Sequence, residues 1–419
     1  MTRSFGELPP VSPAGKNPQG SYSEGKNENS GAMQALVFFL VGSAFTTIYL
    51  TQPVLPVLRA EFGVSAGIAS LSISCVVFGI ALSNLPMGAL ADRLPVRPII
   101  LIGGVMVSVC GVLSAFATNM NLLIITRFVQ GLFIPSMTTC MAAYLAKTLP
   151  RRSLNVVMGA YVSATVAGGL GGRLLGGWIH PPLHWRYAFL SASLLVLVAS
   201  LAAFFYLPRE ASPTKPSPSA EGFIDLLLRR EILCIYLVAF GAFFVFSSVF
   251  NYLPFYLSGP SFNASTGLIT FMYLSYVIGI IVGPLAGKFA NRFGSGMTMT
   301  VGASVFLISI GLTLIGSIFA VMAGLAGICA GFFAIHASAA GALNLQVNES
   351  RGRANSLYVL FYYLGGFTGI SLSGMAYAAA GWPAVVCLGA AILMLPLGVG
   401  FWQMRCNPSL IFADRRKAR

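Results

Sequence analysis

Long intervals without a charged residue are the feature that most constrains this 419-residue chain. No Asp, Glu, Lys or Arg occurs in residues 232–287, 293–348 or 354–404. Each interval is more than twice the about 20 residues that cross the hydrocarbon core of a bilayer as one helix. We therefore expect each interval to cross a membrane twice, as a pair of antiparallel helices.

The first half of the chain shows shorter runs of the same kind, such as residues 29–58 and 62–91. Charged residues make up 9% of the chain, whereas a soluble domain carries about a quarter. The sequence thus predicts an all-α integral membrane protein, with twelve transmembrane helices forming two pseudo-symmetric six-helix bundles. The expected helices span 33–56, 66–91, 99–117, 122–146, 155–178, 187–207, 232–257, 266–289, 297–314, 318–347, 354–379 and 384–404.

Positive charge is unevenly distributed over the expected loops. With the N-terminus inside, every Lys and Arg falls on the cytoplasmic side except Arg59, Arg127, Arg173 and Arg186. This asymmetry is typical of cytoplasmic loops in membrane proteins. It predicts that both termini are cytoplasmic, and it explains the excess of 25 basic over 11 acidic residues without a nucleic-acid partner.

The expected domains follow from composition. Residues 1–32 are rich in Ser, Gly, Pro and Asn and are interpreted as a disordered cytoplasmic tail. Residues 33–207 and 231–405 form the two bundles, 208–230 a proline-rich cytoplasmic linker, and 406–419 a basic cytoplasmic tail.

An internal repeat supports this division. The segment Gly88-Ala-Leu-Ala-Asp92-Arg93 is matched about 200 residues later by Gly287-Lys-Phe-Ala-Asn291-Arg292. The two halves therefore read as copies of one unit, with a substrate site expected at their interface.

Three motifs follow one another in the first half. They are the loop Gly88-Ala-Leu-Ala-Asp92-Arg93-Leu-Pro95-Val-Arg97, the helical segment Arg127-Phe-Val-Gln130-Gly131, and the helical pattern Gly159-x8-Gly168-x3-Gly172-Arg173-x2-Gly176-Gly177. In order and spacing they resemble the loop signature, the R-x-x-Q-G motif and the helix-5 antiporter motif of the major facilitator superfamily. Pro95 replaces the second glycine of the loop signature, and Arg173 stands where proline is usual.

The resemblance covers residues 33–405 and implies a secondary active transporter that works by alternating access. The chain looks most similar to bacterial drug/proton-antiporter-type efflux proteins, which implies proton-coupled export of a small organic compound such as a drug, sugar or metabolite. A proton symporter that imports an organic anion is the alternative. A channel or a receptor is disfavoured. A membrane-embedded enzyme is also disfavoured, because no catalytic constellation is evident.

The loop signature predicts a conformational latch. Asp92 lies at the C-terminal end of a helix, where the helix dipole disfavours an anion, so it needs a partner. Arg93, Arg97 or the helix start near Asn355 are the candidates, and a solvated loop charge is the alternative. The complete latch set is Gly88, Asp92, Arg93, Arg97, Gly287, Asn291 and Arg292, with Asn291 predicting a weaker second copy.

Two arginines fall inside expected helices, where a central cation costs about 2.5–3.5 kcal/mol. Arg127 and Arg173 are predicted either to meet in one polar pocket that serves proton coupling or substrate, together with Gln130, or to be structural. In the structural alternative Arg127 bonds backbone carbonyls and Arg173 extends to the outer headgroups.

The glycines of the fifth helix are predicted to permit close helix packing. Gly159, Gly168, Gly172 and Gly176 are expected to recur on nearly one face, and Gly177 completes the packing set. We expect this face to pack against a helix of the second half and to seal the outer side.

No acidic residue falls in the middle of an expected helix. His336 is therefore the candidate proton carrier, and a hydrogen-bonded neutral histidine is the alternative. By resemblance, the central cavity is lined by Tyr49, Gln52, Arg127, Phe243, Asn251, Tyr252 and His336, with Tyr358, Tyr362 and Tyr363 as secondary candidates.

The seven cysteines show no metal or redox spacing, so we expect no metal and no cofactor. The expected partners are a small-molecule substrate, protons and the lipid bilayer. The expected location is the bacterial inner membrane, and the expected state is a monomer.

Overall fold

The computed structural model describes residues 24–149, 151–208, 222–347 and 350–406, and the regular structure in these ranges is helical. The first half holds α1 (Glu24–Ile48), α2 (Leu55–Phe62), α3 (Ala66–Arg93), α4 (Val96–Ala115), α5 (Met120–Met137), α6 (Thr139–Thr148), α7 (Arg151–Ile179) and α8 (Arg186–Tyr206). The second half holds α9 (Phe223–Leu228), α10 (Arg230–Ser258), α11 (Thr266–Met272), η1 (Tyr273–Ser275), α12 (Tyr276–Phe293), α13 (Ser295–Leu312), α14 (Ile318–Gln346) and α15 (Arg351–Cys406).

Ten segments within the described residues are long and apolar enough to span a membrane. Two additions bring this number to the predicted twelve. The element α15 is two helices, because Ala380 and Gly381 have non-helical backbone angles between them. The glycine-rich α7 is 29 residues long but is absent from the ten apolar segments. The predicted all-α membrane fold is confirmed.

Some boundaries differ from the expected ones. The first helix begins at Glu24, upstream of the expected start at residue 33. The expected helix 122–146 is interrupted at Thr138, just after Pro135, so it consists of α5 and α6. Two short helices lie in segments expected as loops, namely α2 and α9.

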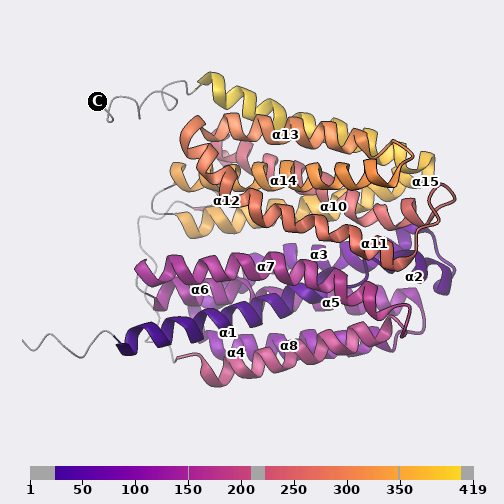
Figure 1. The fold of residues 1–419 in the computed structure, drawn as a ribbon. Helices are drawn as coiled ribbons and strands as arrows, with labels where there is room; N and C mark the ends of the chain where they lie inside the picture. The colour runs from indigo at the N-terminus through magenta and orange to yellow at the C-terminus, as the bar shows by residue number, and fades with distance from the viewer. Residues whose placement is uncertain (1–23, 150, 209–221, 348–349, 407–419) are drawn as a thin grey trace, which may run out of the picture.

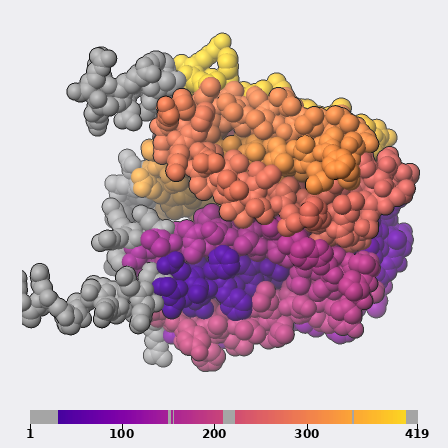
Figure 2. Space-filling view, viewed as in Figure 1, coloured from indigo at the N-terminus to yellow at the C-terminus, as the bar shows by residue number. Residues whose placement is uncertain are grey.

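The spanning helices form two bundles that lie side by side (Figure 1). The chain enters α1 and leaves α15 at the same end of the molecule, which we call the terminal end, and α2 and α11 lie at the opposite, distal end (Figure 1). The space-filling view shows the halves as two blocks in direct contact (Figure 2).

Glycine brings a helix pair close together in each half. A Cβ atom at Gly168 or Gly172 of α7 would lie 2.3 and 2.1 Å from backbone oxygens of α1. In the second half, Gly365 and Gly369 of α15 lie equally close to backbone oxygens of α10, at 2.2 and 2.3 Å. Any side chain at these positions would force the helices apart, so the two halves use one packing device twice.

Helix starts repeat in the same way. The Ser65 hydroxyl caps α3 by accepting the Ile68 N–H at 3.2 Å, and the Ser265 hydroxyl caps α11 by accepting the Leu268 N–H at 3.2 Å. A serine at this position satisfies a backbone donor that the helix itself leaves free. The caps lie at matching positions of the repeat and start the second spanning helix of each half.

One helix pair joins the halves along its whole length. Gly67 of α3 lies close to Gly374 of α15 at the distal end, since a Cβ atom at Gly374 would be 3.3 Å from the Gly67 Cα. Phe78 stacks on Phe367 further along the pair, with ring centroids 4.5 Å apart. Toward the terminal end, the Asn84 side chain donates to the Ser356 carbonyl at 3.3 Å. The pair α3 and α15 is therefore a continuous seam.

Candidate functional site

Arg127 of α5 is fully buried and joins three helices. Its Nη1 and Nη2 atoms donate to the carbonyls of Thr47 and Ile48 at 2.8 and 2.6 Å, and its Nε donates to the Ser72 carbonyl of α3 at 2.9 Å. The two α1 carbonyls lie in the last turn of that helix, where backbone oxygens lack intrahelical donors and a cation is favoured. Arg127 thus caps α1 and ties it to α3 and α5.

Gln130 extends this network by one helix. Its side-chain oxygen accepts a hydrogen bond from Arg127, and its Nε2 donates to the Val107 carbonyl of α4 at 3.0 Å. Charge-assisted bonds contribute about 1.5–3 kcal/mol each, which offsets the burial of the guanidinium. In this conformation Arg127 makes the backbone contacts that its structural alternative predicts.

Arg173 of α7 lies in a separate cage where the two halves meet. Its Nε donates to Gln52 Oε1 at 2.7 Å, its Nη1 to the Gly169 carbonyl at 2.6 Å, and its Nη2 to the Tyr276 hydroxyl at 2.7 Å. The guanidinium also lies 3.9 Å from the ring centroid of Tyr49, 4.2 Å from that of Tyr276 and 5.6 Å from that of Tyr273.

Local structure explains why two tyrosines face Arg173. Tyr273 and Tyr276 flank the 3₁₀ turn η1, in which side chains three residues apart lie one above the other. In an α-helix the same spacing also places two residues on one face, but about 60° apart around the axis. The short turn therefore presents both rings to one guanidinium, and their π faces attract it.

Two expectations about the arginines are wrong. Arg173 does not extend to a headgroup region, because it is 2% exposed and enclosed by Gln52 and three tyrosines. The two arginines also do not share a pocket, since Arg127 bonds α1, α3 and α5 whereas Arg173 bonds Gln52, α7 and Tyr276 of the second half.

The glycines of α7 pack, but mostly not against the expected partner. Gly168, Gly172 and Gly176 face α1 of the same half. Gly177 faces the second half, where Thr270 of α11 occupies the space a Cβ atom would need. Gly159 has nothing within 4 Å of that space. The expected seal against the second half therefore depends on Gly177 and Arg173, not on the whole glycine face.

The halves are closed at the distal end. Besides the contacts of Arg173 and Gly177, the Asn251 side chain of α10 donates to the Ser70 hydroxyl of α3 at 2.7 Å. Asn251 is fully buried. Polar contacts thus join the halves at two places of the distal end, between α7 and α12 and between α3 and α10.

Toward the terminal end, the same faces of α7 and α12 carry glycines without close neighbours. Gly159 lies about five turns before Gly177 and on the same face of α7, and no described atom lies within 4 Å of its Cβ position. Likewise Gly283 and Gly287 share the face of α12 that carries Tyr276, and no described atom lies within 4 Å of their Cβ positions. The contacts that join α7 and α12 at the distal end therefore do not continue at these terminal-end positions.

His336 of α14 lies in an aromatic cluster of the second half. Its Nδ1 lies 2.9 Å from the Tyr358 hydroxyl, and its ring lies 5.8 Å from Phe332 and 5.2 Å from Tyr362. Tyr362 in turn stacks on Phe243 at 3.7 Å. His336 is half-buried and hydrogen-bonded. This is compatible both with a proton carrier and with a neutral, hydrogen-bonded histidine.

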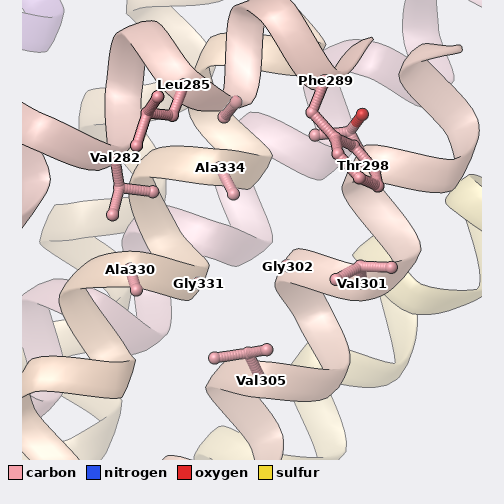
Figure 3. A pocket seen from close by; sticks show the side chains of 11 residues that line it. Val282, Leu285, Phe289, Thr298, Val301, Gly302, Val305, Ala330, Gly331 and Ala334 are labelled. Carbon is pink, nitrogen blue, oxygen red and sulfur yellow. The ribbon is translucent and has the colours of Figure 1, made fainter. Parts of the chain in front are cut away.

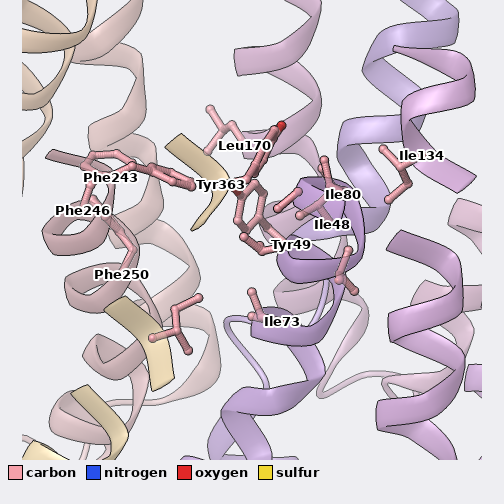
Figure 4. Close-up of a cluster of buried hydrophobic side chains, with 14 of the residues drawn as sticks. Ile48, Tyr49, Ile73, Ile80, Ile134, Leu170, Phe243, Phe246, Phe250 and Tyr363 are labelled. Atoms are coloured by element: carbon pink, nitrogen blue, oxygen red, sulfur yellow. The ribbon is translucent and has the colours of Figure 1, made fainter. Parts of the chain in front are cut away.

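The aromatic rings continue toward the first half. Phe243, Phe246 and Phe250 lie along α10, and Tyr363 lies between this row and Tyr49, the residue that follows α1 (Figure 4). Tyr252 does not join them, since its hydroxyl donates to the Ile370 carbonyl of α15 at 2.9 Å. Of the expected cavity residues, Tyr49, Gln52 and Asn251 lie where the halves face each other, and Phe243 and His336 lie in the aromatic cluster. Arg127 and Tyr252 instead bond backbone carbonyls within their own halves.

The latch residues have partners that the sequence did not indicate. Asp92 forms an ion pair with Lys147 at the end of α6, with Nζ and Oδ1 3.0 Å apart. Lys147 also donates to the Ala91 carbonyl at 2.7 Å, so it caps α3 as well. Arg97 instead caps α8 through the Phe204 carbonyl at 2.8 Å, and Arg93 is exposed.

The expected docking of Asp92 near Asn355 is not found in this conformation. Asn355 donates to Asn344 Oδ1 at 3.0 Å. In the second copy, Gly287 and Asn291 line a cavity of about 450 Å³ between α12, α14 and Arg351, and Arg292 lies against Phe293. This cavity lies at the terminal end.

A second cavity, of about 270 Å³, is apolar and lies between α12, α13 and α14 (Figure 3). Val282, Val301 and Ala334 are among its lining residues, and none of the described lining residues comes from the first half. It is therefore not the interface where a substrate site is expected.

Sequence reasoning missed Tyr273, Tyr276, Ser70 and Lys147. The tyrosines lie in an apolar run with no motif, and only the packing of the second half against α7 shows that both meet Arg173. Lys147 was visible as a loop cation, but its distance from Asp92 along the chain concealed the pairing.

Twelve membrane-spanning helices in two related halves, joined by polar contacts at the distal end, are the architecture of a multi-pass transport protein. The chain belongs to the Major Facilitator Superfamily, whose family model matches residues 37–318. It is a transport protein rather than an enzyme, as its relatives also indicate.

Two relatives illustrate the similarity. The chain is 30% identical over 371 residues to the inner membrane transport protein YnfM of Escherichia coli (strain K12), covering 87% of this chain and 89% of the relative. It is 27% identical over 389 residues to the uncharacterized MFS-type transporter YybF of Bacillus subtilis (strain 168), covering 91% and 95%.

Solved structures share the fold. A bacterial homologue of the human lysosomal transporter Spinster, crystallised in an inward-facing and unoccupied conformation, matches with a TM-score of 0.66 at 15% sequence identity. The match covers 94% of this chain and 98% of that structure.

Proposed function

We propose that this protein is a proton-coupled secondary active transporter that exports a small organic compound by alternating access. The observation that carries the proposal is that α7 and α12 are in contact at the distal end but have no close neighbours at the terminal-end glycines of the same faces. Closure by Arg173 and Gly177 at the distal end, with open space beside Gly159 and Gly287, is one of the two end states that alternating access requires.

The charge distribution supports an orientation in the bacterial inner membrane. Exposed or partly exposed cations gather at the terminal end, among them Arg93, Lys147, Arg292 and Arg351. Since cytoplasmic loops carry the excess of Lys and Arg, we assign the terminal end and both termini to the cytoplasm. The conformation described here is then open to the cytoplasm.

The proposed mechanism follows from the positions of the contacts between the two halves. Because α3 and α15 touch along their length, they serve as the axis about which one half rocks against the other. Opening the distal end breaks the Arg173–Tyr276 and Asn251–Ser70 hydrogen bonds, while α7 and α12 approach at the terminal end. Asp92, which pairs with Lys147 of its own half in this conformation, is the latch residue that docks on the second half when the terminal end closes, and the neutral Asn291 makes the second copy weaker.

We assign proton coupling to His336. The expected spans contain no Asp or Glu at mid-depth, and an imidazole titrates near neutral pH. The Tyr358 hydroxyl at 2.9 Å supplies a hydrogen-bond partner for either protonation state. Tyr362 and Phe243 then offer flat apolar surfaces for the substrate. The transporter is proposed to work as a monomer.

Import of an organic anion with protons is the second candidate. It is favoured by one observation, namely that the buried cation Arg173 is surrounded by neutral acceptors and aromatic rings, with no carboxylate among its described contacts. The direction of transport distinguishes the two candidates.

Proteoliposomes with an internal pH dye test both. A panel of organic anions, neutral metabolites and cationic drugs is added under a set pH gradient, with protein-free liposomes as the control. Substrate-triggered proton counterflow supports export, and proton movement in the same direction as an anion supports import. Downhill flux that no proton gradient can drive uphill would refute coupling altogether.

A further inference from the structure

We propose that Arg173 and Gln52 form an anion site that becomes available when the distal end opens, and that it takes the carboxylate of an organic anion with a planar body. The inference rests on the proposed alternating access and names a ligand class for it. No such site is implied by the family motif, in which proline is usual at the position of Arg173.

The contacts of Arg173 divide unequally between the halves. Gln52, Gly169 and Tyr49 belong to the first half and stay with Arg173 when the halves separate. Tyr273 and Tyr276 belong to the second half and leave. Distal opening therefore removes one hydrogen bond and two aromatic faces from a guanidinium that keeps its charge.

The vacated position is surrounded by unused donors. A guanidinium has five N–H groups. In the closed state Arg173 donates three hydrogen bonds, to Gln52, Gly169 and Tyr276, and the bond to Tyr276 is lost on opening. Gln52 is fully buried, and its Nε2 atom has no hydrogen-bond partner among the described residues. A buried amide donor without a partner is unfavourable, so a ligand that accepts from it gains affinity.

The chemistry of this set selects an anion. Every free polar group is a donor, which a carboxylate satisfies with two acceptor oxygens in the geometry of a guanidinium. A cationic ligand would be repelled by Arg173 and would find no counter-charge. The ring of Tyr49, 3.9 Å from the guanidinium, adds a flat surface on which an aromatic acid can lie.

Binding and opening are coupled in this arrangement. In the closed state the Tyr276 hydroxyl occupies the position that the carboxylate needs, so the anion competes with closure. The apparent affinity therefore depends on the fraction of molecules that are open at the distal end. A change that weakens closure without touching Arg173 or Gln52 is expected to raise the affinity.

The test measures benzoate binding by calorimetry to the full-length protein in lipid nanodiscs, with benzamide as the neutral analogue. Tyr276→Phe removes the hydroxyl that competes with the ligand and is expected to tighten benzoate binding about tenfold, the effect of losing one charge-assisted bond. Tyr273→Phe is the matched control, because the Tyr273 hydroxyl donates to the Phe250 carbonyl at 2.9 Å and not to Arg173. It is expected to change the affinity less than about twofold.

Gln52→Glu provides the opposite change. It keeps the size of the side chain and supplies a carboxylate to Arg173 from within the protein, so benzoate binding is expected to be lost while the fold is retained. Benzamide binding as tight as benzoate, equal effects of the two tyrosine variants, or unchanged binding in Gln52→Glu would each overturn the anion site.

A distance measurement separates this outcome from failure of alternating access. Spin labels at Leu183 and Asn263, in the turns that follow α7 and α10, report the width of the distal end in a variant without native cysteines. Benzoate is expected to shift the distances toward the open state. Labels that separate under a proton gradient but ignore benzoate would refute the anion site alone, whereas labels that never separate would refute the proposed function as well.

Discussion

The Nη2 of Arg173 on α7 donates a 2.7 Å hydrogen bond to the hydroxyl of Tyr276 on α12, and this bond joins the two halves of the transporter. The same two helices have no contact at Gly159 and Gly287 among the described residues. A single pair of helices is therefore joined at the distal end and has no close contact at these terminal-end glycines, which is the pattern expected of a gate.

The first prediction concerns the close contact between α1 and α7. Gly172→Ala places a Cβ atom 2.1 Å from the Thr46 carbonyl oxygen, so the helices must move apart. Overpacking of this kind destabilises a protein by about 1–3 kcal/mol. We expect a lower thermal unfolding midpoint in detergent and reduced transport.

Gly159→Ala is the matched control on the same helix, because nothing lies within 4 Å of its Cβ position. It is expected to leave the unfolding midpoint unchanged or slightly raised, since alanine favours helix. An equal loss of stability in both variants would show that the helix backbone, not the contact with α1, is affected.

The second prediction concerns Arg127. Arg127→Lys replaces a planar group with several donors by a single ammonium, which cannot reach the Thr47, Ile48 and Ser72 carbonyls together. Each carbonyl left unsatisfied costs about 1–3 kcal/mol. We expect a strongly destabilised protein, measured as loss of monodisperse material on size-exclusion chromatography after mild heating.

Substrate flux in the surviving Arg127→Lys protein distinguishes a structural from a coupling role. A structural arginine predicts reduced stability with normal proton stoichiometry per molecule transported. Normal stability with lost proton coupling would instead make Arg127 part of the transport chemistry.

The third prediction concerns the ion pair of Asp92 and Lys147. The Asp92 side chain is 62% exposed, so the pair contributes only about 0–1 kcal/mol to stability. Asp92→Asn is therefore expected to leave the unfolding midpoint almost unchanged but to slow transport severalfold, because the latch is lost. Initial rates in proteoliposomes give the measurement.

Exchange of the two charges tests whether the pairing itself matters. Asp92→Lys combined with Lys147→Asp is expected to transport faster than either single variant. A double variant as slow as the single ones would mean that Asp92 acts through another partner, and unaffected flux in Asp92→Asn would remove it from the mechanism.

The fourth prediction concerns His336 and Tyr358. His336→Gln retains a polar group but cannot carry a proton near neutral pH, so we expect proton-driven uphill transport to be lost while substrate exchange across the membrane at equal pH continues. Tyr358→Phe removes the hydroxyl 2.9 Å from Nδ1 and is expected to shift the pH dependence of transport without abolishing it.

Loss of exchange and of uphill transport together in His336→Gln would place the residue in substrate binding rather than in coupling. Proton-driven accumulation at the original level would require another proton carrier. Both quantities are measured on the same vesicles with a radiolabelled substrate and a pH dye.

The sequence by itself determined the membrane-spanning topology. A helix in lipid must be apolar over about 20 residues, so charge-free intervals such as 354–404 leave few alternatives. The sequence also predicted that Gly168 and Gly172 permit close helix packing, because a glycine within a transmembrane helix commonly serves that purpose. Even so, periodicity alone did not reveal that their partner is α1.

Only the tertiary structure decided which polar groups meet. Arg127 and Arg173 look alike in sequence, yet one caps the end of α1 and the other lies among tyrosines of both halves. The end of α1 at Ile48 leaves backbone carbonyls free for Arg127, whereas the packing of α7 against the second half brings Tyr273 and Tyr276 to Arg173. Hydrogen bonds are short-ranged and directional, so the partner of a buried charge depends on the packing of helices that are distant along the chain.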